Sequence, residues 1–400
     1  MDGARMTLAE THAAETRASG AGAGEIASTR AAFFVSGLAM AAWAPLVPYA
    51  KARLGVDDGT LGLLLLCLGG GSLMAMPLAG MLTARLGCRR VILAAAAVIA
   101  CALPALTVGA DVAMVAAALL VFGAGLGTID VAMNIQAVLV ERASGRAIMS
   151  GFHGLFSLGG ITGAGGTAAI LWGGAPPLAA ALAVMAIMAA LMLRYGGRLL
   201  RHGTGSGGPA FALPRGPVLA IGILCFICFL TEGAMLDWSA VFLTDVRGVA
   251  AAQAGIAFAL FSVAMTAGRF LGDRLVQAAG PTIVLCGGGL CAACGLTLAV
   301  LSPWPAAALA GFVLVGAGCS NVAPLLFSAA GRQRSMPEHL SVAAVTTLGY
   351  AGVLAGPAGI GLVADHVGLG TALLGVAGLL TLMAAASPAV MRVTRGAERA

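Results

Sequence analysis

Gly123-Ala-Gly-Leu-Gly-Thr-Ile-Asp-Val-Ala-Met-Asn134 is an apolar run that carries one acid, Asp130, and one amide, Asn134. Four residues make about one turn of an α-helix, so these two side chains share a face with Gly123 and Gly127. An ionisable group inside a membrane helix is costly and usually serves a function. The stretch therefore predicts a membrane-spanning helix with a polar, glycine-lined stripe.

The rest of the chain has the composition of a polytopic membrane protein. Hydrophobic residues make up 60% of the 400 positions and charged residues 10%, and the mean hydropathy is +0.99. Soluble domains carry about 25% charged residues. Apolar segments of about 20 residues, enough to span a bilayer, recur to the end of the chain. We place twelve, at 30–50, 59–82, 89–109, 112–135, 149–172, 176–195, 217–243, 250–271, 281–301, 305–328, 341–363 and 369–390.

The charges between these spans predict the orientation. With both termini on the cytoplasmic side, 19 of the 22 lysines and arginines lie inside, counting Arg269 at the end of span eight. The outside then holds only Lys51, Arg53 and Arg247. An excess of basic residues marks the cytoplasmic side of membrane proteins. We therefore expect a multi-pass protein of a bacterial inner membrane with both termini in the cytoplasm.

The segment 196–216 divides the spans six and six. It contains Gly203-Thr-Gly-Ser-Gly-Gly208, which is typical of a flexible linker. The halves echo each other, because Ala84-Arg-Leu86 after span two matches Asp273-Arg-Leu275 after span eight. We expect a disordered tail at 1–28, six-helix bundles at 29–195 and 217–391, and a second tail at 392–400. Parallel six-span repeats of this kind are a transporter architecture.

The loop Gly80-Met-Leu-Thr-Ala-Arg-Leu-Gly-Cys-Arg-Arg90 resembles the loop signature of the major facilitator superfamily, Gly-x-Leu-x-Asp-Arg-x-Gly-x-Arg-Arg. The chain departs from it at Ala84, where the signature has an acid, whereas the second copy keeps the acid in Gly272-Asp-Arg274. The resemblance implies an all-α fold of twelve helices in two bundles around a central binding site. It also implies a role in the gate for Arg85, Arg89, Arg90, Asp273 and Arg274.

Within that superfamily, Asp130-Val-Ala-Met-Asn134 is similar to the acid-x-Ala-x-Asn run in span four of the fucose-permease-like sugar–proton symporters. Two other stretches, Phe152-His-Gly-Leu-Phe-Ser-Leu-Gly159 and Glu232-Gly-Ala-Met-Leu-Asp-Trp-Ser239, look like segments of a poorly characterised bacterial branch near those permeases. The permeases also carry an acid in span one. Here Trp43-Ala-Pro45 occupies that region, and no acid stands between 30 and 50.

Span seven carries the acids Glu232 and Asp237, five residues apart and therefore on different faces. Counted from residue 217, Glu232 lies about 22 Å along the helix, inside the membrane, and Asp237 about 30 Å along, near the outer rim. Asp130 falls in the inner half of span four. We expect Asp130 and Glu232 to be a pair of proton-coupling or cation-binding acids, one from each bundle.

Several of these assignments have alternatives. Asp237 could contact the solute or could be an interfacial cap or gate charge. Asp130 could instead pair with Arg142 or Arg146 and brace the inner gate, and Glu232 could be a structural, hydrogen-bonded acid. His153 opens span five near Asp130 and Asn134, either as a packed helix-start residue or as a proton relay.

Other side chains of the spans are candidates for contact with solute. Asn321 precedes Pro324, and a proline inside a helix frees a backbone carbonyl that a binding site can use. Trp43, Trp238 and Tyr350 could stack on a sugar ring or an organic cation. Trp238 could equally anchor the helix at the membrane interface.

The sequence thus predicts a secondary active transporter that moves a small polar organic solute, with proton symport as the leading mode and proton-antiport export as the alternative. A non-transporting membrane sensor is a remote third. No ATP-binding loop is present, His153 has no second histidine within a span, and no basic run with interleaved aromatic residues exists. We therefore expect a monomer in the lipid bilayer that is not an enzyme, needs no cofactor or metal and binds no nucleic acid; its partners are the solute and protons.

Overall fold

A computed structural model describes residues 22–202 and 213–399 of the chain. Every regular element in those two ranges is helical. Twelve helices there are long and apolar enough to cross a membrane. The predicted fold class of twelve membrane helices is confirmed.

The first six spans run from α2 to α8. The first span is α2 (Ala23–Ala42), continued by the short helices η1 (Ala44–Leu46) and α3 (Val47–Leu54). The next five are α4 (Asp58–Leu86), α5 (Cys88–Val108), α6 (Val112–Ser144), α7 (Met149–Trp172) and α8 (Pro177–Tyr195), which ends in the 3-10 turn η2 (Gly196–Arg198).

The last six spans run from α9 to α16. The seventh is α9 (Pro217–Val241), extended by a π-helical turn, η3 (Phe242–Val246), and followed by the short α10 (Ala251–Ala254). The others are α11 (Ile256–Ala279), α12 (Pro281–Leu301), a broken span of α13 (Pro305–Cys319) and α14 (Val322–Arg332), α15 (Glu338–Val367) and α16 (Leu369–Arg399).

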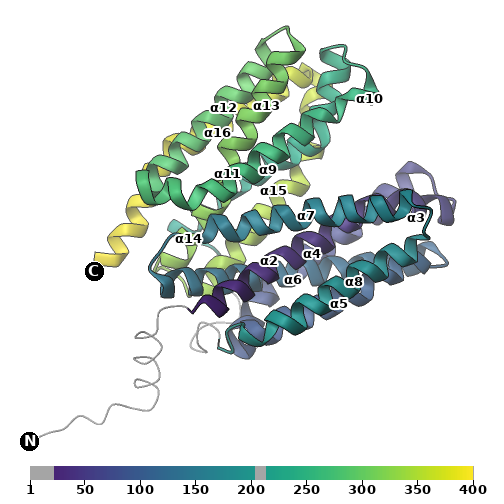
Figure 1. The fold of residues 1–400 in the computed structure, drawn as a ribbon. Helices are drawn as coiled ribbons and strands as arrows, with labels where there is room; N and C mark the ends of the chain where they lie inside the picture. The colour runs from purple at the N-terminus through teal and green to yellow at the C-terminus, as the bar shows by residue number, and fades with distance from the viewer. Residues whose placement is uncertain (1–21, 203–212, 400) are drawn as a thin grey trace, which may run out of the picture.

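Figure 1 shows two groups of helices, α2–α8 in purple to teal and α9–α16 in green to yellow. We call the end of the bundle at which α2 begins and α16 stops the termini end. The two groups meet along two seams, one between α4 and α15 and one between α7 and α11, and α14 reaches across to α6 and α7. At the end opposite the termini end, α3 lies in the first group and α10 lies in the second (Figure 1).

The two halves repeat one contact at the end opposite the termini. Arg53, after the first span, donates hydrogen bonds to the carbonyls that finish α5, with its Nη1 2.7 Å from the oxygen of Thr107. Arg247, after the seventh span, does the same at the end of α12, with its Nη2 3.1 Å from the oxygen of Ala299. The last carbonyls of a helix lack partners within it, so each arginine satisfies one helix end.

The structure corrects three predicted boundaries. The predicted tail 1–28 is too long, because α2 already begins at Ala23. The Glu25 carboxylate accepts a hydrogen bond from the Gly22 amide at 3.1 Å, at the start of this helix. Residues 1–21 of the predicted tail lie outside the described residues. The predicted tail 392–400 continues as α16 to Arg399. The linker glycines 203–208 also lie outside the described residues.

The third correction concerns α6. We predicted that span four ends at 135, where polar residues begin to interrupt its apolar run. The helix α6 instead continues to Ser144. It stops only where Gly145 adopts a left-handed φ of 63°, which glycine reaches without steric cost. The longer helix places Asp130 near its middle, about 21 Å from the termini end, and not in an inner half.

Candidate functional site

The central polar feature is an ion pair between Glu232 of α9 and Arg269 of α11. The Arg269 Nη2 lies 3.5 Å from the Glu232 Oε1. The arginine side chain is buried, whereas 23% of the Glu232 side chain is exposed. Arg269 also crosses to the other half, since its Nη1 donates to the Ser157 hydroxyl of α7 at 2.6 Å. Arg269 therefore connects Glu232, in its own half, with Ser157 in the other half.

Arg269 corrects the sequence analysis. We counted it among the cytoplasmic arginines, but α11 continues to Ala279, so Arg269 lies about 15 Å inside that helix. Its position two residues before the predicted end of span eight was the signal that could have identified it. A buried arginine needs an anion and further acceptors, and this one finds both.

The break between α13 and α14 supplies one of those acceptors. Pro324 has no amide hydrogen, so the carbonyl of Ser320, four residues earlier, has no partner within the helix. That carbonyl accepts a hydrogen bond from the Arg269 Nε at 3.4 Å. Asn321 stands at the break, and its Nδ2 donates to the Gly268 carbonyl at 3.1 Å. Its Oδ1 is buried and has no hydrogen-bond partner.

The stretch around Asp130 lies in a helix-packing seam. Gly123 and Gly127 press against the backbone of α4, where a Cβ at Gly127 would lie 2.6 Å from the Ser72 carbonyl oxygen. The Asn134 Nδ2 donates to the Asp130 carbonyl at 2.9 Å and contacts its carboxylate at 3.3 Å. Asn134 is fully buried, and Asp130 is half-buried. The two polar residues thus form one unit, as their spacing indicated.

The opposite half also reaches this unit. Tyr350 of α15 lies within electrostatic range of Asp130. Cys225 of α9 is buried within electrostatic range of both Asp130 and Glu232. The two acids therefore share surroundings, while each has its own hydrogen-bonding partner. Arg142, the first alternative partner of Asp130, instead forms an ion pair with Glu338 and a hydrogen bond with the Gly331 carbonyl.

The printed contacts of His153, expected near Asp130 and Asn134, are with two phenylalanine rings. Its ring packs edge-on against Phe33, with centroids 5.1 Å apart, and stacks on Phe327 at 5.6 Å. It interacts electrostatically with Arg269. The side chain is 7% exposed, and its Nε2 has no hydrogen-bond partner.

The remaining candidates lie toward the opposite end. Trp43 caps the end of α2 and is buried, and Trp238 packs its ring against Gly361 of α15. Both indole N–H groups are buried without a partner. Asp237, one residue before Trp238, is exposed.

The termini end is closed by contacts between the halves. The Asp273 carboxylate of α11 accepts hydrogen bonds from the first amides of α7, at 2.9 Å from Ser150 and 3.0 Å from Gly151. The Glu141 carboxylate of α6 accepts from the Ser328 hydroxyl of α14 at 2.5 Å and lies 3.8 Å from Arg332.

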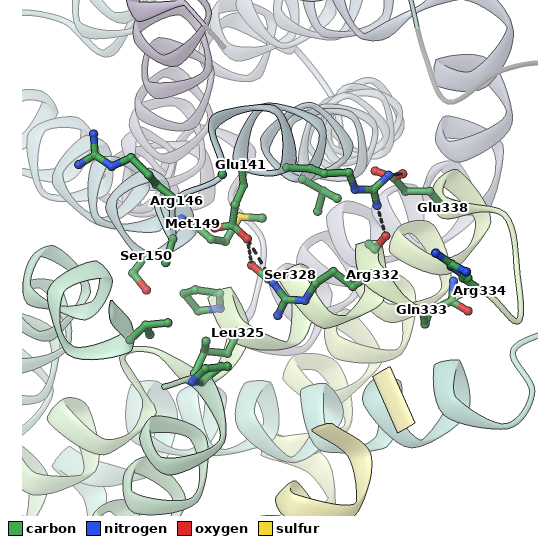
Figure 2. Close-up of a pocket in the computed structure, with 18 of the residues that line it drawn as sticks. Glu141, Arg146, Met149, Ser150, Leu325, Ser328, Arg332, Gln333, Arg334 and Glu338 are labelled. Atoms are coloured by element: carbon green, nitrogen blue, oxygen red, sulfur yellow. Dashed lines mark hydrogen bonds and ion pairs between the residues drawn. The ribbon is translucent and has the colours of Figure 1, made fainter. Parts of the chain in front are cut away.

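A third contact completes this closure. The Arg142 Nη1 of α6 lies 2.9 Å from the Glu338 Oε2, at the start of α15. The three contacts surround a cavity of about 1190 Å³ that opens at the termini end, and Figure 2 shows Glu141 pointing toward Ser328 and Arg332 across it.

Of the five predicted gate residues, the structure places Asp273 in this closure. Arg85, Arg90 and Arg274 are exposed, and Arg89 contributes its backbone amide to the Leu200 carbonyl at 2.9 Å. Sequence reasoning missed four other residues of this closure, Glu141, Ser328, Arg332 and Glu338, and gave Arg142 a different partner. The charges of Glu141, Arg332 and Glu338 near the ends of spans four, ten and eleven were the available signal.

With this geometry in view, the chain can be compared with known proteins. A family model described as Major Facilitator Superfamily matches residues 31–357. The chain belongs to this superfamily. It is therefore a multi-pass membrane protein and a secondary transporter, not an enzyme, as predicted.

Two curated relatives agree with the family. An uncharacterized MFS-type transporter of Yersinia pestis is 58% identical over 366 residues, which cover 91% of this chain and 95% of the relative. Membrane protein MosC of Rhizobium meliloti is 33% identical over 358 residues, covering 89% of this chain and 87% of MosC. The predicted kinship with a poorly characterised bacterial branch is confirmed.

Solved structures share the fold. The major facilitator transporter FucP in its outward conformation superposes with a TM-score of 0.78 at 16% identity, covering 91% of this chain and 98% of FucP. The human organic anion transporter MFSD10 gives a TM-score of 0.74 at 17% identity, covering 91% and 99%. At these identities the likeness extends to the fold alone.

Proposed function

We propose that this transporter moves a small polar organic solute across a bacterial inner membrane by alternating access, in symport with protons. We place both termini in the cytoplasm. Arg142, Arg146, Arg332 and Arg334 gather around the cavity at the termini end, and such a gathering is typical of a cytoplasmic face. In this assignment, the structure is the state in which the cytoplasmic side is closed.

The observation that carries the proposal is the Glu232–Arg269 pair with its bond to Ser157. A proton on Glu232 removes the negative charge that Arg269 faces at 3.5 Å. A buried cation left without its anion is strongly destabilised, so Arg269 must then move or find a new partner. Because Arg269 also holds Ser157 of the other half, protonation changes a contact between the halves. Proton binding and conformation are linked by that change.

Asp130, Asn134 and Tyr350 form the solute-binding region of this proposal. Asp130 lies about 21 Å from the termini end along α6, and Glu232 about 22 Å from it along α9, so the two acids lie at one depth. Tyr350 comes from the opposite half and interacts with Asp130. A solute bound here would contact both halves, as alternating access requires. Carboxylate, amide and hydroxyl groups suit a polar solute with hydroxyl or amino groups.

The test begins by finding the solute. A thermal-shift screen of purified protein against sugars, nucleosides, amino acids and antibiotics at two pH values identifies it, because a ligand that binds the folded state raises its apparent stability. Glu232→Gln is then compared with wild type in proteoliposomes. We expect it to keep solute exchange without a gradient and to lose proton-driven accumulation by about tenfold or more, which corresponds to 1.4 kcal/mol.

Asp237→Asn is the matched control, because it removes an exposed acid from the same helix. It should accumulate solute as wild type does. Accumulation by Glu232→Gln equal to that of wild type would refute proton coupling at this pair.

Proton-antiport export is the second candidate, and one observation favours it. The fucose-permease-like symporters carry an acid in span one, and this chain has none between residues 30 and 50. Vesicles with imposed proton gradients of either sign separate the two modes. Accumulation when the outside is acidic supports symport, and accumulation in vesicles with an acidic interior supports antiport.

A further inference from the structure

A polar stripe crosses the seam between α7 and α11. Ser150, His153 and Ser157 are spaced three and four residues apart, so they lie on one face of α7. Arg269 and Asp273 are spaced four apart on α11 and contact the two ends of that stripe. Arg269 binds the Ser157 hydroxyl at 2.6 Å, and Asp273 accepts from the Ser150 amide at 2.9 Å. His153 is the middle member and makes no such contact.

The environment of His153 is divided between the two halves. Phe33 belongs to its own half, while Phe327 and Arg269 belong to the other. The imidazole is 7% exposed, and its Nε2 is buried without a partner. A buried polar atom without a partner costs about 1–3 kcal/mol, so its presence calls for an explanation. The Oδ1 of Asn321, against Gly272 of the same seam, is likewise unpartnered.

Burial and charge both act on His153 in the closed state. Burial withdraws water from the ring, which disfavours imidazolium, and Arg269 of α11 adds the effect of a like charge. The carboxylate of Asp273 is bound to the α7 amides, and Arg30 of α2 interacts with that carboxylate. From α9, Glu232 is paired with Arg269.

Two more helices that pack against α7 are α14 and α6. Phe327 is the contact from α14. On α6, Glu141 is bound to the amides of Ile148 and Met149. The nearby acids are thus engaged with other groups.

We propose that His153 is a second proton-binding residue, which takes up a proton when α7 and α11 separate at the termini end. Separation carries Phe327 and Arg269 away from the ring and admits water to its Nε2. As the seam closes and Arg269 returns, the proton goes back to the water of the same side. This inference rests on the proposed function, because opening at the termini end is a step of the alternating access proposed there. By linkage, acid on that side must favour the open seam.

The experiment measures opening directly and needs no solute. Spin labels are attached through a ketone-bearing unnatural amino acid, so the nine free cysteines stay in place. They replace Ala143 on α6 and Ala278 on α11, which are small, exposed and in opposite halves. Electron–electron distances are recorded between pH 5 and pH 8. In wild type, the ratio of open to closed molecules should rise as the pH falls, by at most about tenfold per pH unit for one proton.

His153→Gln should remove most of that pH dependence, and His366→Gln, which removes an exposed histidine at the other end of α15, should leave it intact. If His153→Gln does not fold, His153→Phe replaces it, because a phenyl ring fills the space between Phe33 and Phe327 and cannot bind a proton. Thermal unfolding of each variant checks the fold. A pH response unchanged in either folded His153 variant overturns the inference.

Glu232→Gln, measured alongside, separates this inference from the proposed function. Loss of the pH response in Glu232→Gln alone supports proton binding at Glu232 and refutes it at His153. Loss in the His153 variant alone supports this inference. If both variants respond as wild type does, both proposals fail.

Discussion

The N-termini of α7 and α15 begin the fifth and eleventh spans and occupy equivalent places in the two halves, but they are held in different ways. The start of α7 receives the Asp273 carboxylate from the other half, which accepts two backbone hydrogen bonds. The start of α15 has no acid from the other half, because Ala84 stands where the second copy has Asp273. Its first-turn acid is its own Glu338, paired with Arg142 across the boundary between the halves.

The seams behind these helix ends differ in the same sense. The α7–α11 seam carries the polar contacts of Arg269 and Asp273. At the termini end of the α4–α15 seam, Gly80 packs against α15, where a Cβ at Gly80 would lie 2.8 Å from the Cβ of Ala343. Separating α7 from α11 therefore exposes charged groups that water must solvate, whereas α4 and α15 lose close packing. The contrast teaches that the two copies of the loop signature differ in role. The copy with Asp273 caps a helix of the other half with a charge, and the copy with Gly80 and Ala84 supplies a packing surface.

Removing the charge of Asp273 should have the largest effect on this contrast. In Asp273→Asn, the side chain keeps one acceptor oxygen and loses both its charge and its second acceptor. We expect the closed state to lose about 1–2 kcal/mol, as for loss of a helix cap. Thermal unfolding of the detergent-purified protein and the spin-label distance between positions 143 and 278 measure it. Arg274→Gln, an exposed neighbour, is the control and should change neither value.

Glu338→Gln should weaken the α15 end by less. Arg142 is 51% exposed and Glu338 12% exposed at the side chain, and water screens such a pair. We expect a loss of about 0.5–1 kcal/mol, which includes the favourable effect of an acid in the first turn of a helix. The loss should shrink in high salt, unlike that of Asp273→Asn. A loss larger than that of Asp273→Asn would reverse the comparison.

The fold could be predicted from the sequence because bilayer thickness fixes the length of an apolar span. The spans at 149–172 and 281–301 were placed at their observed ends, since charges or glycine–proline turns flank them. Span four was cut short because Glu141 and Arg142 belong to a helix that continues past the apolar run. Apolarity marks where the bilayer lies, and hydrogen bonding determines where the helix stops.

The site was predicted in part. Asp130 and Asn134 interact as their spacing of four indicated, since that relation is local to one helix. Arg269 was missed because its partners, Glu232 and Ser157, come from other helices, and no local pattern records such a meeting. The contacts of Glu141 with Ser328 and Arg332 were missed for the same reason.

Restoring the missing acid as Ala84→Asp should have the smallest effect and tests the comparison most directly. Position 84 lies one turn beyond Gly80, whose packing partners on α15 are His339 and Ala343. In wild type, a new carboxylate would meet Glu338, and the repulsion between like charges should offset any gain from capping, for a net change within about 0.5 kcal/mol.

In Glu338→Gln, the same substitution should recover most of the lost stability, because the start of α15 then lacks an acid. A double-mutant cycle on unfolding temperature gives the coupling between positions 84 and 338. A gain from Ala84→Asp of equal size in both backgrounds would mean that the two acids act independently, and that the start of α15 can accept a cap like that of α7 without giving up its own. A gain only in Glu338→Gln would mean that Glu338 takes over, at that helix end, the role that Asp273 plays for α7.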